Sequence, residues 1–170
     1  MTSNIRRQLT LFVEPKDAEK IEKVRQEFNP RQSELIKSHV TLCREDEIEN
    51  LEQVLTNLNR LTQSSIFIEF GHPTRFENGK GILMAAMEDN VQFQELRRQI
   101  LIGINDNPGK QIPHITLMHP RNSTCTDKIF KLIEKIKLPT KFEFKSVSLI
   151  EQKDGAHWKI LQQFELKDRT

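Results

Sequence analysis

One four-residue pattern occurs twice, and both copies lie on segments typical of β-strands. Residues 39–42 are HVTL and residues 114–117 are HITL, so each copy is a histidine, a β-branched aliphatic residue, a threonine and a leucine. Because side chains alternate between the two faces of a strand, the histidine and the threonine of each copy share one face. The aliphatic residues then share the other face. Each copy therefore predicts a strand with one polar face and one buried face.

The segments around the two copies follow the same order. The spacing of apolar residues predicts, before the turn-rich stretch 71–81, strands at 6–13, 38–43 and 64–70 and helices at 17–28 and 45–61. After that stretch it predicts strands at 82–87, 114–118, 141–152 and 157–166 and helices at 91–104 and 126–137. Asp17 is expected to cap the first helix. The last two strands are expected to form a hairpin across KDGA. This order predicts an internal duplication, with repeats at approximately 5–72 and 79–168.

The predicted fold class is α+β. We expect one domain over residues 1–170, built as a bilobal, pseudo-symmetric fold in which two antiparallel β-sheets line a central groove and two helices lie outside each lobe. The 170 residues suffice to bury a sizeable core. Nothing in the composition divides the chain into separate domains.

Composition and charge exclude several classes of protein. A formal net charge of +2 is too small for a general nucleic-acid or membrane binder, although a local basic groove is compatible with it. The two cysteines, Cys43 and Cys125, form no disulfide framework and have no metal-ligand spacing. No apolar stretch is long enough for a signal peptide or a membrane span. We expect a cytoplasmic protein with no membrane association, no obligate protein partner and a monomeric state.

The paired motif favours acid–base chemistry on a phosphate. If the two polar faces come together, they place two imidazoles and two threonine hydroxyls in one groove. Near neutral pH one imidazole can accept a proton while the other donates one. The hydroxyls can hydrogen-bond the non-bridging oxygens of a phosphate. Hydrolysis or transesterification of an activated cyclic phosphodiester by this route requires no metal and no cofactor.

The two motifs resemble those of the 2H phosphoesterase superfamily, whose mark is a pair of His-x-Thr-hydrophobic motifs on strands of a bilobal α/β fold. The chain is similar over nearly its whole length, most of all to small bacterial proteins of the 2′-5′ RNA ligase-like and cyclic phosphodiesterase kind. The resemblance implies that His39 and His114 are the catalytic pair and that Thr41 and Thr116 bind the substrate phosphate. It also implies a nucleotide or an RNA terminus as the substrate.

One departure from the family pattern concerns the residues after the second motif. The chain continues MHP, where family members often carry an arginine. We consider Arg44, Lys80 and Trp158 as substrate contacts, although a solvated surface charge is the more common role for such a cation. Phe12 and Phe76, like Trp158, could stack on a base at the edge of the groove, although an aromatic residue on a strand belongs more often to the core.

Other candidate sites have weaker support. His119 lies five positions after His114, on the opposite face of an ideal strand, and Pro120 ends that strand, so we expect His119 in the next turn and no metal site. Cys43 lies two positions after Thr41 and is expected at the rim of the groove, but nothing in the sequence marks it as a nucleophile. A non-catalytic nucleotide or RNA-end binding module of the same fold stays open as an alternative to an enzyme.

Overall fold

The computed structural model describes residues 2–167. Its elements in chain order are β1 (Ile5–Phe12), α1 (Pro15–Phe28), α2 (Pro30–Leu35), β2 (His39–Cys43), a 3₁₀ turn (Glu45–Glu47), α3 (Leu51–Asn59), β3 (Ile66–Glu69), β4 (Thr74–Arg75), β5 (Ile82–Ala85), α4 (Val91–Ile100), β6 (His114–Met118), α5 (Asp127–Glu134), β7 (Lys141–Phe144), β8 (Ser146–Lys153) and β9 (Lys159–Glu165).

The strands form two antiparallel sheets, which confirms the predicted α+β class. The large sheet has the order β4-β5-β6-β2-β1-β8-β9, and the small one pairs β3 with β7. The division is unequal, because both histidine strands, β2 and β6, are neighbours in the large sheet. The two motifs therefore lie side by side on one sheet instead of on two facing sheets.

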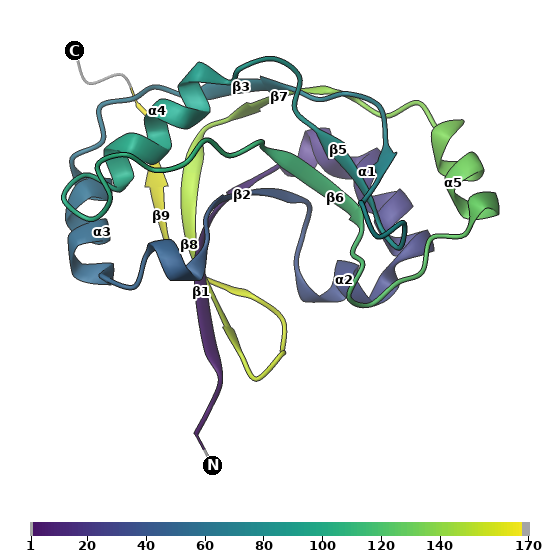
Figure 1. Cartoon of the computed structure of the whole chain (residues 1–170), viewed down its shortest axis with the longest axis horizontal. Helices are drawn as coiled ribbons and strands as arrows, with labels where there is room; N and C mark the ends of the chain where they lie inside the picture. Colours follow the sequence, from purple (N-terminus) through teal and green to yellow (C-terminus); the bar gives the residue numbers. More distant parts are fainter. Residues whose placement is uncertain (1, 168–170) are drawn as a thin grey trace.

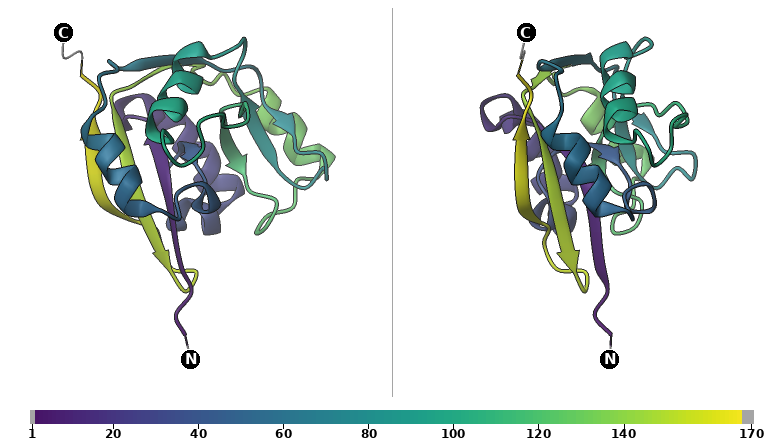
Figure 2. Two further views of the ribbon diagram at one scale, coloured as in Figure 1. Left: turned by 60° about the vertical axis from the view of Figure 1, so that its left-hand side comes forward. Right: turned by 90° about the vertical axis from the view of Figure 1, so that its left-hand side faces the viewer.

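The helices lie in two groups on either side of the molecule (Figure 1). One group is α3 and α4, which contact each other, and the other is α1, α2 and α5. Helix α1 also contacts β6. Each group thus contains helices from before and after the turn-rich stretch 71–81. Figure 2 shows that β1 and the β8–β9 hairpin extend together beyond the helices.

The alternation predicted for the two motif strands is confirmed. Strands β2 and β6 share one burial pattern, in which the histidine and threonine are half-buried and the residues between and after them are buried. Val40, Leu42, Ile115 and Leu117 are at most 1% exposed. They join a single apolar cluster under the helices, and burying such side chains is worth roughly 1.5–3 kcal/mol each.

Several predicted boundaries are wrong. Helix α1 begins at Pro15 after Glu14, upstream of Asp17, because proline fits the first helical position, where no backbone donor is needed. The helix predicted over 45–61 is broken into the 3₁₀ turn and α3. The strand predicted over 141–152 is two strands, β7 and β8, which belong to different sheets. Helix α2 and the short β4 had not been predicted.

The β8–β9 hairpin is confirmed, with Glu151 paired to Lys159 across its tip. Helix α4 ends at Ile100, before the predicted 104, and Val91 at its start is 73% exposed. Among residues 2–167, no helix combines the length and apolar character needed to cross a membrane.

A buried arginine joins the end of β2 to α4. Arg97 is 3% exposed and donates from Nη1 to the carbonyl oxygen of Leu42 at 2.6 Å. Its guanidinium also makes a two-point ion pair with the carboxylate of Glu47, at 3.1 and 2.7 Å. This contact fixes the segment that follows the first histidine motif.

We predict that Arg97→Ala lowers the free energy of unfolding by about 3 kcal/mol, because the substitution leaves Glu47 and a backbone carbonyl without their partner. Urea unfolding measures this loss. The matched control is Arg98→Ala, which removes an exposed pair with Glu95 and should change the free energy of unfolding much less. Equal losses in the two variants would contradict the role of Arg97.

Candidate active site

The pairing of β2 with β6 brings the two motifs together. Val40 pairs with Ile115 in an antiparallel register. This register aligns His39 with Thr116 and Thr41 with His114, because the paired positions run in opposite directions. All four side chains are half-buried and share the face opposite the core. We call this the polar face: each histidine stands opposite the threonine of the other motif.

Both imidazoles are held in the same way by the backbone. Nδ1 of His39 lies 2.7 Å from the carbonyl oxygen of Lys37, and Nδ1 of His114 lies 3.5 Å from that of Ile112. A carbonyl oxygen only accepts, so Nδ1 carries the proton of the neutral ring. The other nitrogen, Nε2, is therefore the atom that gains or loses a proton.

The surroundings of His39 strongly favour the neutral ring. Burial lowers its pKa from 6.5 to about 4, and the charges of Arg25 and His114 add to this effect, against the Lys37 carbonyl and Glu22. Burial and the charge of Arg44 also lower the pKa of His114, in this case against its bond to Ile112. Both imidazoles are consequently neutral at pH 7 when no ligand is bound.

Arg25 is a buried charge behind His39 that the sequence pattern did not single out. It is 1% exposed, pairs with Glu22 at 3.1 Å and donates to the carbonyl oxygen of Ile36 at 2.8 Å. The Glu22 carboxylate in turn accepts from the backbone N–H of Ser38 at 2.6 Å. This network fixes the entry to β2. The sign of this network in the sequence is that Arg25 lies four positions after Ile21, on the apolar stripe of α1.

Each imidazole also meets the edge of a phenylalanine ring. Phe12 lies 6.1 Å from His39 between ring centres, and Phe76 lies 6.2 Å from His114. These rings help to keep water from the imidazoles, consistent with the desolvation that lowers both pKa values. The structure thus gives Phe12 and Phe76 a ring contact with the two histidines.

Arg44 is the predicted contact that lies near the pair. Its charge reaches His114, and both residues line a hollow of about 560 Å³ together with Lys110, Gln111 and Arg97. The other residues of this hollow are Asp46, Glu47, Gly109 and Ile112. The hollow offers cationic and amide donors beside one imidazole.

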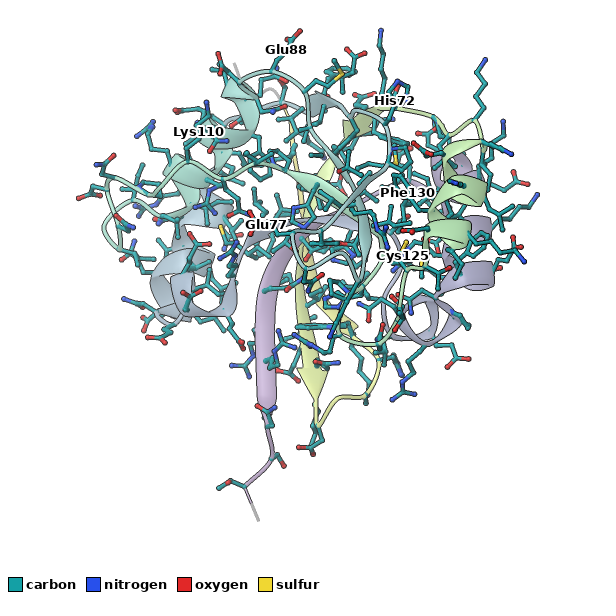
Figure 3. The ribbon with its side chains drawn as sticks, turned by 45° about the vertical axis from the view of Figure 1, so that its right-hand side comes forward. His72, Glu77, Glu88, Lys110, Cys125 and Phe130 are labelled. Atoms are coloured by element: carbon teal, nitrogen blue, oxygen red, sulfur yellow. The ribbon has the colours of Figure 1, made fainter. Side chains whose placement is uncertain are left out.

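Lys80 and Trp158 occupy different places. Lys80 is exposed in the β4–β5 connection, the segment that also carries Glu77 in Figure 3, and its carbonyl accepts from the N–H of Cys125. Within residues 2–167, its charge is not among those that shift either motif imidazole. Trp158 lies in the β8–β9 connection, stacked on Arg6.

His119 follows the end of β6, as the sequence predicted, and lies within electrostatic reach of His114. Strand β6 ends at Met118, as predicted, but His119 is half-buried, and the charges of Arg121, Arg6 and His114 add to burial in lowering its pKa. Its Nδ1 accepts from the backbone N–H of Arg121 at 3.0 Å, which leaves Nε2–H as a donor in the neutral ring. In the described part of the chain, no three His, Cys, Asp or Glu side chains are grouped to hold a metal.

The expectation that Cys43 lies at the rim is wrong. The β1–β2 ladder shifts register between Leu9 and Thr10, so Cys43 pairs with Leu9, whose side chain is in the core. Paired residues share a face, and Cys43 is 0% exposed. Burial raises the pKa of its thiol to about 12, so it is protonated at pH 7.

Comparisons with known proteins agree with this architecture. A family model described as the 2′-5′ RNA ligase superfamily matches residues 13–156. No curated protein sequence matches the chain. Escherichia coli LigT complexed with 3′-AMP is 15% identical, with a TM-score of 0.61 over 95% of this chain and 98% of LigT.

Two further solved structures are similar over most of their length. A protein described as a phosphoesterase is 14% identical, with a TM-score of 0.63 over 96% of this chain and 99% of its own. The protein TT0787 of Thermus thermophilus is 13% identical, with a TM-score of 0.58 over 97% of this chain and 100% of its own. At these identities the similarity shows a shared fold.

The sheet order and the two adjacent His-x-Thr strands define a protein of the 2H phosphoesterase class, which confirms the resemblance noted in the sequence. Within that class, the chain belongs to the 2′-5′ RNA ligase superfamily.

The lowered pKa of His39 predicts a loss of stability in acid. The unfolded histidine, near 6.5, binds a proton more readily than the folded one, near 4, so stability is full above pH 6.5 and falls as the pH drops to 4. At 1.36 kcal/mol per pKa unit the loss is on the order of 3 kcal/mol. In urea unfolding, the free energy of unfolding should fall between pH 7 and pH 4 by that amount less in His39→Asn than in wild type. His72→Asn, at an exposed position, is the control, and equal losses in wild type and His39→Asn would refute the shift.

Proposed function

We propose that the protein is a metal-independent phosphodiesterase or RNA ligase-like enzyme that acts on 2′,3′-cyclic phosphate or 2′-5′-linked nucleotide or RNA substrates. The observation that carries this proposal is the register of β2 and β6, in which each imidazole stands opposite a threonine hydroxyl. A phosphate between the strands would be within reach of both kinds of group. The capture of 3′-AMP by LigT, a protein of the same fold, supports a nucleotide ligand.

In this proposal His39 is the general base. Its pKa of about 4 leaves Nε2 unprotonated over the whole neutral range, ready to accept a proton. In hydrolysis Nε2 takes a proton from water while the water oxygen forms a bond to phosphorus. In ligation the 5′-hydroxyl of a second RNA end replaces the water, and the 3′ oxygen of the cyclic phosphate is the leaving oxygen.

His114 is the general acid. Its Nε2 gives a proton to the leaving oxygen as the bond from phosphorus to that oxygen breaks. The pKa of His114 is the less strongly lowered of the two, and the negative charge of a bound phosphate raises it again. Thr41 and Thr116 hydrogen-bond the non-bridging oxygens and hold the phosphorus between the imidazoles.

One observation favours a second candidate, a non-catalytic module that binds nucleotides or RNA ends. Both imidazole pKa values are lowered, so the unliganded site has no protonated donor at pH 7. Stoichiometric binding of a cyclic nucleotide without turnover, over pH 4 to 8, would favour this module over the enzyme.

Among the predicted substrate contacts, Arg44 is the best placed, because it lines the same hollow as His114. Lys80 would contact the substrate only if its side chain turned toward the polar face. We also propose a monomeric state, a cytoplasmic location and an internal duplication. The shared bond from Nδ1 to the carbonyl two residues earlier supports the duplication. Residue 168, the predicted end of the second repeat, lies outside the described residues.

We expect His39→Ala and His114→Ala each to lower kcat by about 10²–10⁴-fold on a 2′,3′-cyclic nucleotide, because each variant lacks one proton-transfer group. Circular dichroism should show both variants folded at pH 7. His72→Ala is the control, since this histidine is exposed and belongs to neither motif. A mild loss in both motif variants would refute the acid–base pair.

The wild-type activity should survive EDTA, since the proposed proton transfers involve only imidazoles. The same substrate assayed with and without the chelator measures this. Loss of activity with EDTA and its return with zinc would refute the metal-independent mechanism.

We expect kcat/KM to peak in mild acid. The base is competent above its pKa of about 4, and the acid is competent below its own pKa, which is lower than 6.5. The pH profile of kcat should lie at higher pH than that of kcat/KM, because the bound phosphate raises the pKa values of both imidazoles. Initial rates from pH 3.5 to 9 test this, and a kcat/KM maximum above pH 7.5 would contradict the assignment.

A further inference from the structure

The polar face continues from β2 onto β1, away from the paired motifs. Phe12 pairs with His39 and Thr10 pairs with Thr41, so both lie on the polar face. By the alternation of a strand, Gln8 and Arg6 follow on the same face. Gln8 donates to the hydroxyl of Thr10 at 2.9 Å. Thr10, Gln8 and Arg6 thus form a polar row in which Thr10 is fully buried and Arg6 lies four residue steps, or about 13 Å, away from it.

Arg6 is held in place at the end of this row. Its guanidinium lies over the Trp158 ring, 5.3 Å from the ring centre. Its Nη1 donates to Gln152 at 3.2 Å and its Nε to Glu45 at 3.3 Å. Within residues 2–167, Nη2 of Arg6 has no hydrogen-bond partner and is available to a ligand.

The backbone of Trp158 is itself anchored to the end of α2. Its backbone N–H donates to the carbonyl oxygen of Leu35, at the end of α2, at 2.8 Å. The tip of the β8–β9 hairpin therefore reaches from the extended end of the sheet to α2, the helix that precedes His39 (Figure 1). Arg6 is therefore stacked on a ring whose backbone is anchored, and this arrangement limits the entropy that Arg6 loses on binding.

His119 lies within electrostatic reach of both His114 and Arg6, because the charge of each lowers its pKa. On the polar face itself, the strand register places Arg6 beyond Thr10 and Thr41. Arg121, whose charge also reaches His119, adds a second guanidinium nearby.

We propose that Arg6, positioned by Trp158, binds a second phosphate of the substrate, next to the one that reacts between His39 and His114. The inference rests on the proposed function and deepens it. The substrate class is a nucleotide with at least two phosphates in line, such as an RNA end, in preference to a lone cyclic mononucleotide. The second phosphate is either internucleotide or a 5′-terminal one.

The neighbouring Arg7 supplies a matched control. It lies on the opposite face of β1, exposed, with an ion pair to Glu151 at 2.8 Å. Arg7→Ala removes the same charge from the same strand, but the loss is on the far face from the site. The two variants separate a local subsite from a general effect of net charge.

The kinetic test compares adenosine 2′,3′-cyclic phosphate, its 5′-phosphorylated form and the dinucleotide ApA 2′,3′-cyclic phosphate. Arg6→Ala should lower kcat/KM for the dinucleotide about 10- to 100-fold more than for the unphosphorylated mononucleotide, the range for one charge-assisted hydrogen bond. Arg7→Ala should leave this ratio unchanged. Equal losses on all three substrates in Arg6→Ala would overturn the proposal and assign Arg6 a structural role.

The comparison also identifies the source of the phosphate. A loss on the 5′-phosphorylated mononucleotide equal to that on the dinucleotide supports a subsite that takes a terminal phosphate. A loss confined to the dinucleotide supports an internucleotide phosphate.

Trp158 provides a second readout that does not require turnover. The chain has one tryptophan and no tyrosine, so its intrinsic emission comes from Trp158. Titration of wild type with ApA 3′-phosphate should change this emission at lower concentration than 3′-AMP does, and Arg6→Ala should abolish the difference. Emission that responds identically to both ligands in wild type would overturn the subsite.

These outcomes separate the two proposals. If wild type hydrolyses none of the three substrates but the titration distinguishes the two ligands, the proposed activity fails and the subsite stands. If hydrolysis occurs and Arg6→Ala leaves the substrate ratio intact, the activity stands and the subsite fails.

Discussion

The antiparallel pairing of β2 with β6 is the constraint on which the site depends. The ladder between these strands is short, and its register is fixed by Val40 and Ile115, both 0% exposed in the core. A slip of one residue would move every side chain of one strand to the other face, which would bury a histidine and expose a leucine. The apolar residues of the two motifs therefore specify the position of the polar ones, so packing in the core sets the geometry of the opposite face.

The same burial that orders the imidazoles also sets their charge. Half-buried rings against phenylalanine edges, with Arg25 behind one and Arg44 near the other, disfavour protonation of both. In the proposed mechanism, such a site would provide a base when no ligand is bound, and an acid would form only when an anion enters and offsets the positive surroundings. The ligand would thus complete the protonation pattern required for its own conversion, which connects binding and catalysis through electrostatics.

Local periodicity predicted much of the fold, and long-range packing explains where it failed. The alternation of β2 and β6 and the C-terminal hairpin follow from side-chain patterns alone. The register shift that turns Cys43 into the core depends on its partner Leu9, and no local pattern shows it. The position of His119 depends on how the chain turns after Met118.

The candidate site shows the same limit. The residue types and their faces could be predicted, because a strand fixes both. The stacking of Arg6 on Trp158 could not, because it requires the hairpin tip to reach Leu35. The buried pair of Arg25 and Glu22 likewise needs the folded neighbours that cover it.

The side-by-side placement of β2 and β6 has a consequence for folding. Residues 39 and 114 are far apart in sequence, so the strands meet only after a long loop has closed, a non-local contact of the kind that slows folding. Neither half of the chain holds both imidazoles, and the pairing of β2 with β6 forms only when both halves are present. Turnover would then report the fully assembled chain and would serve as a direct assay of the native state during refolding.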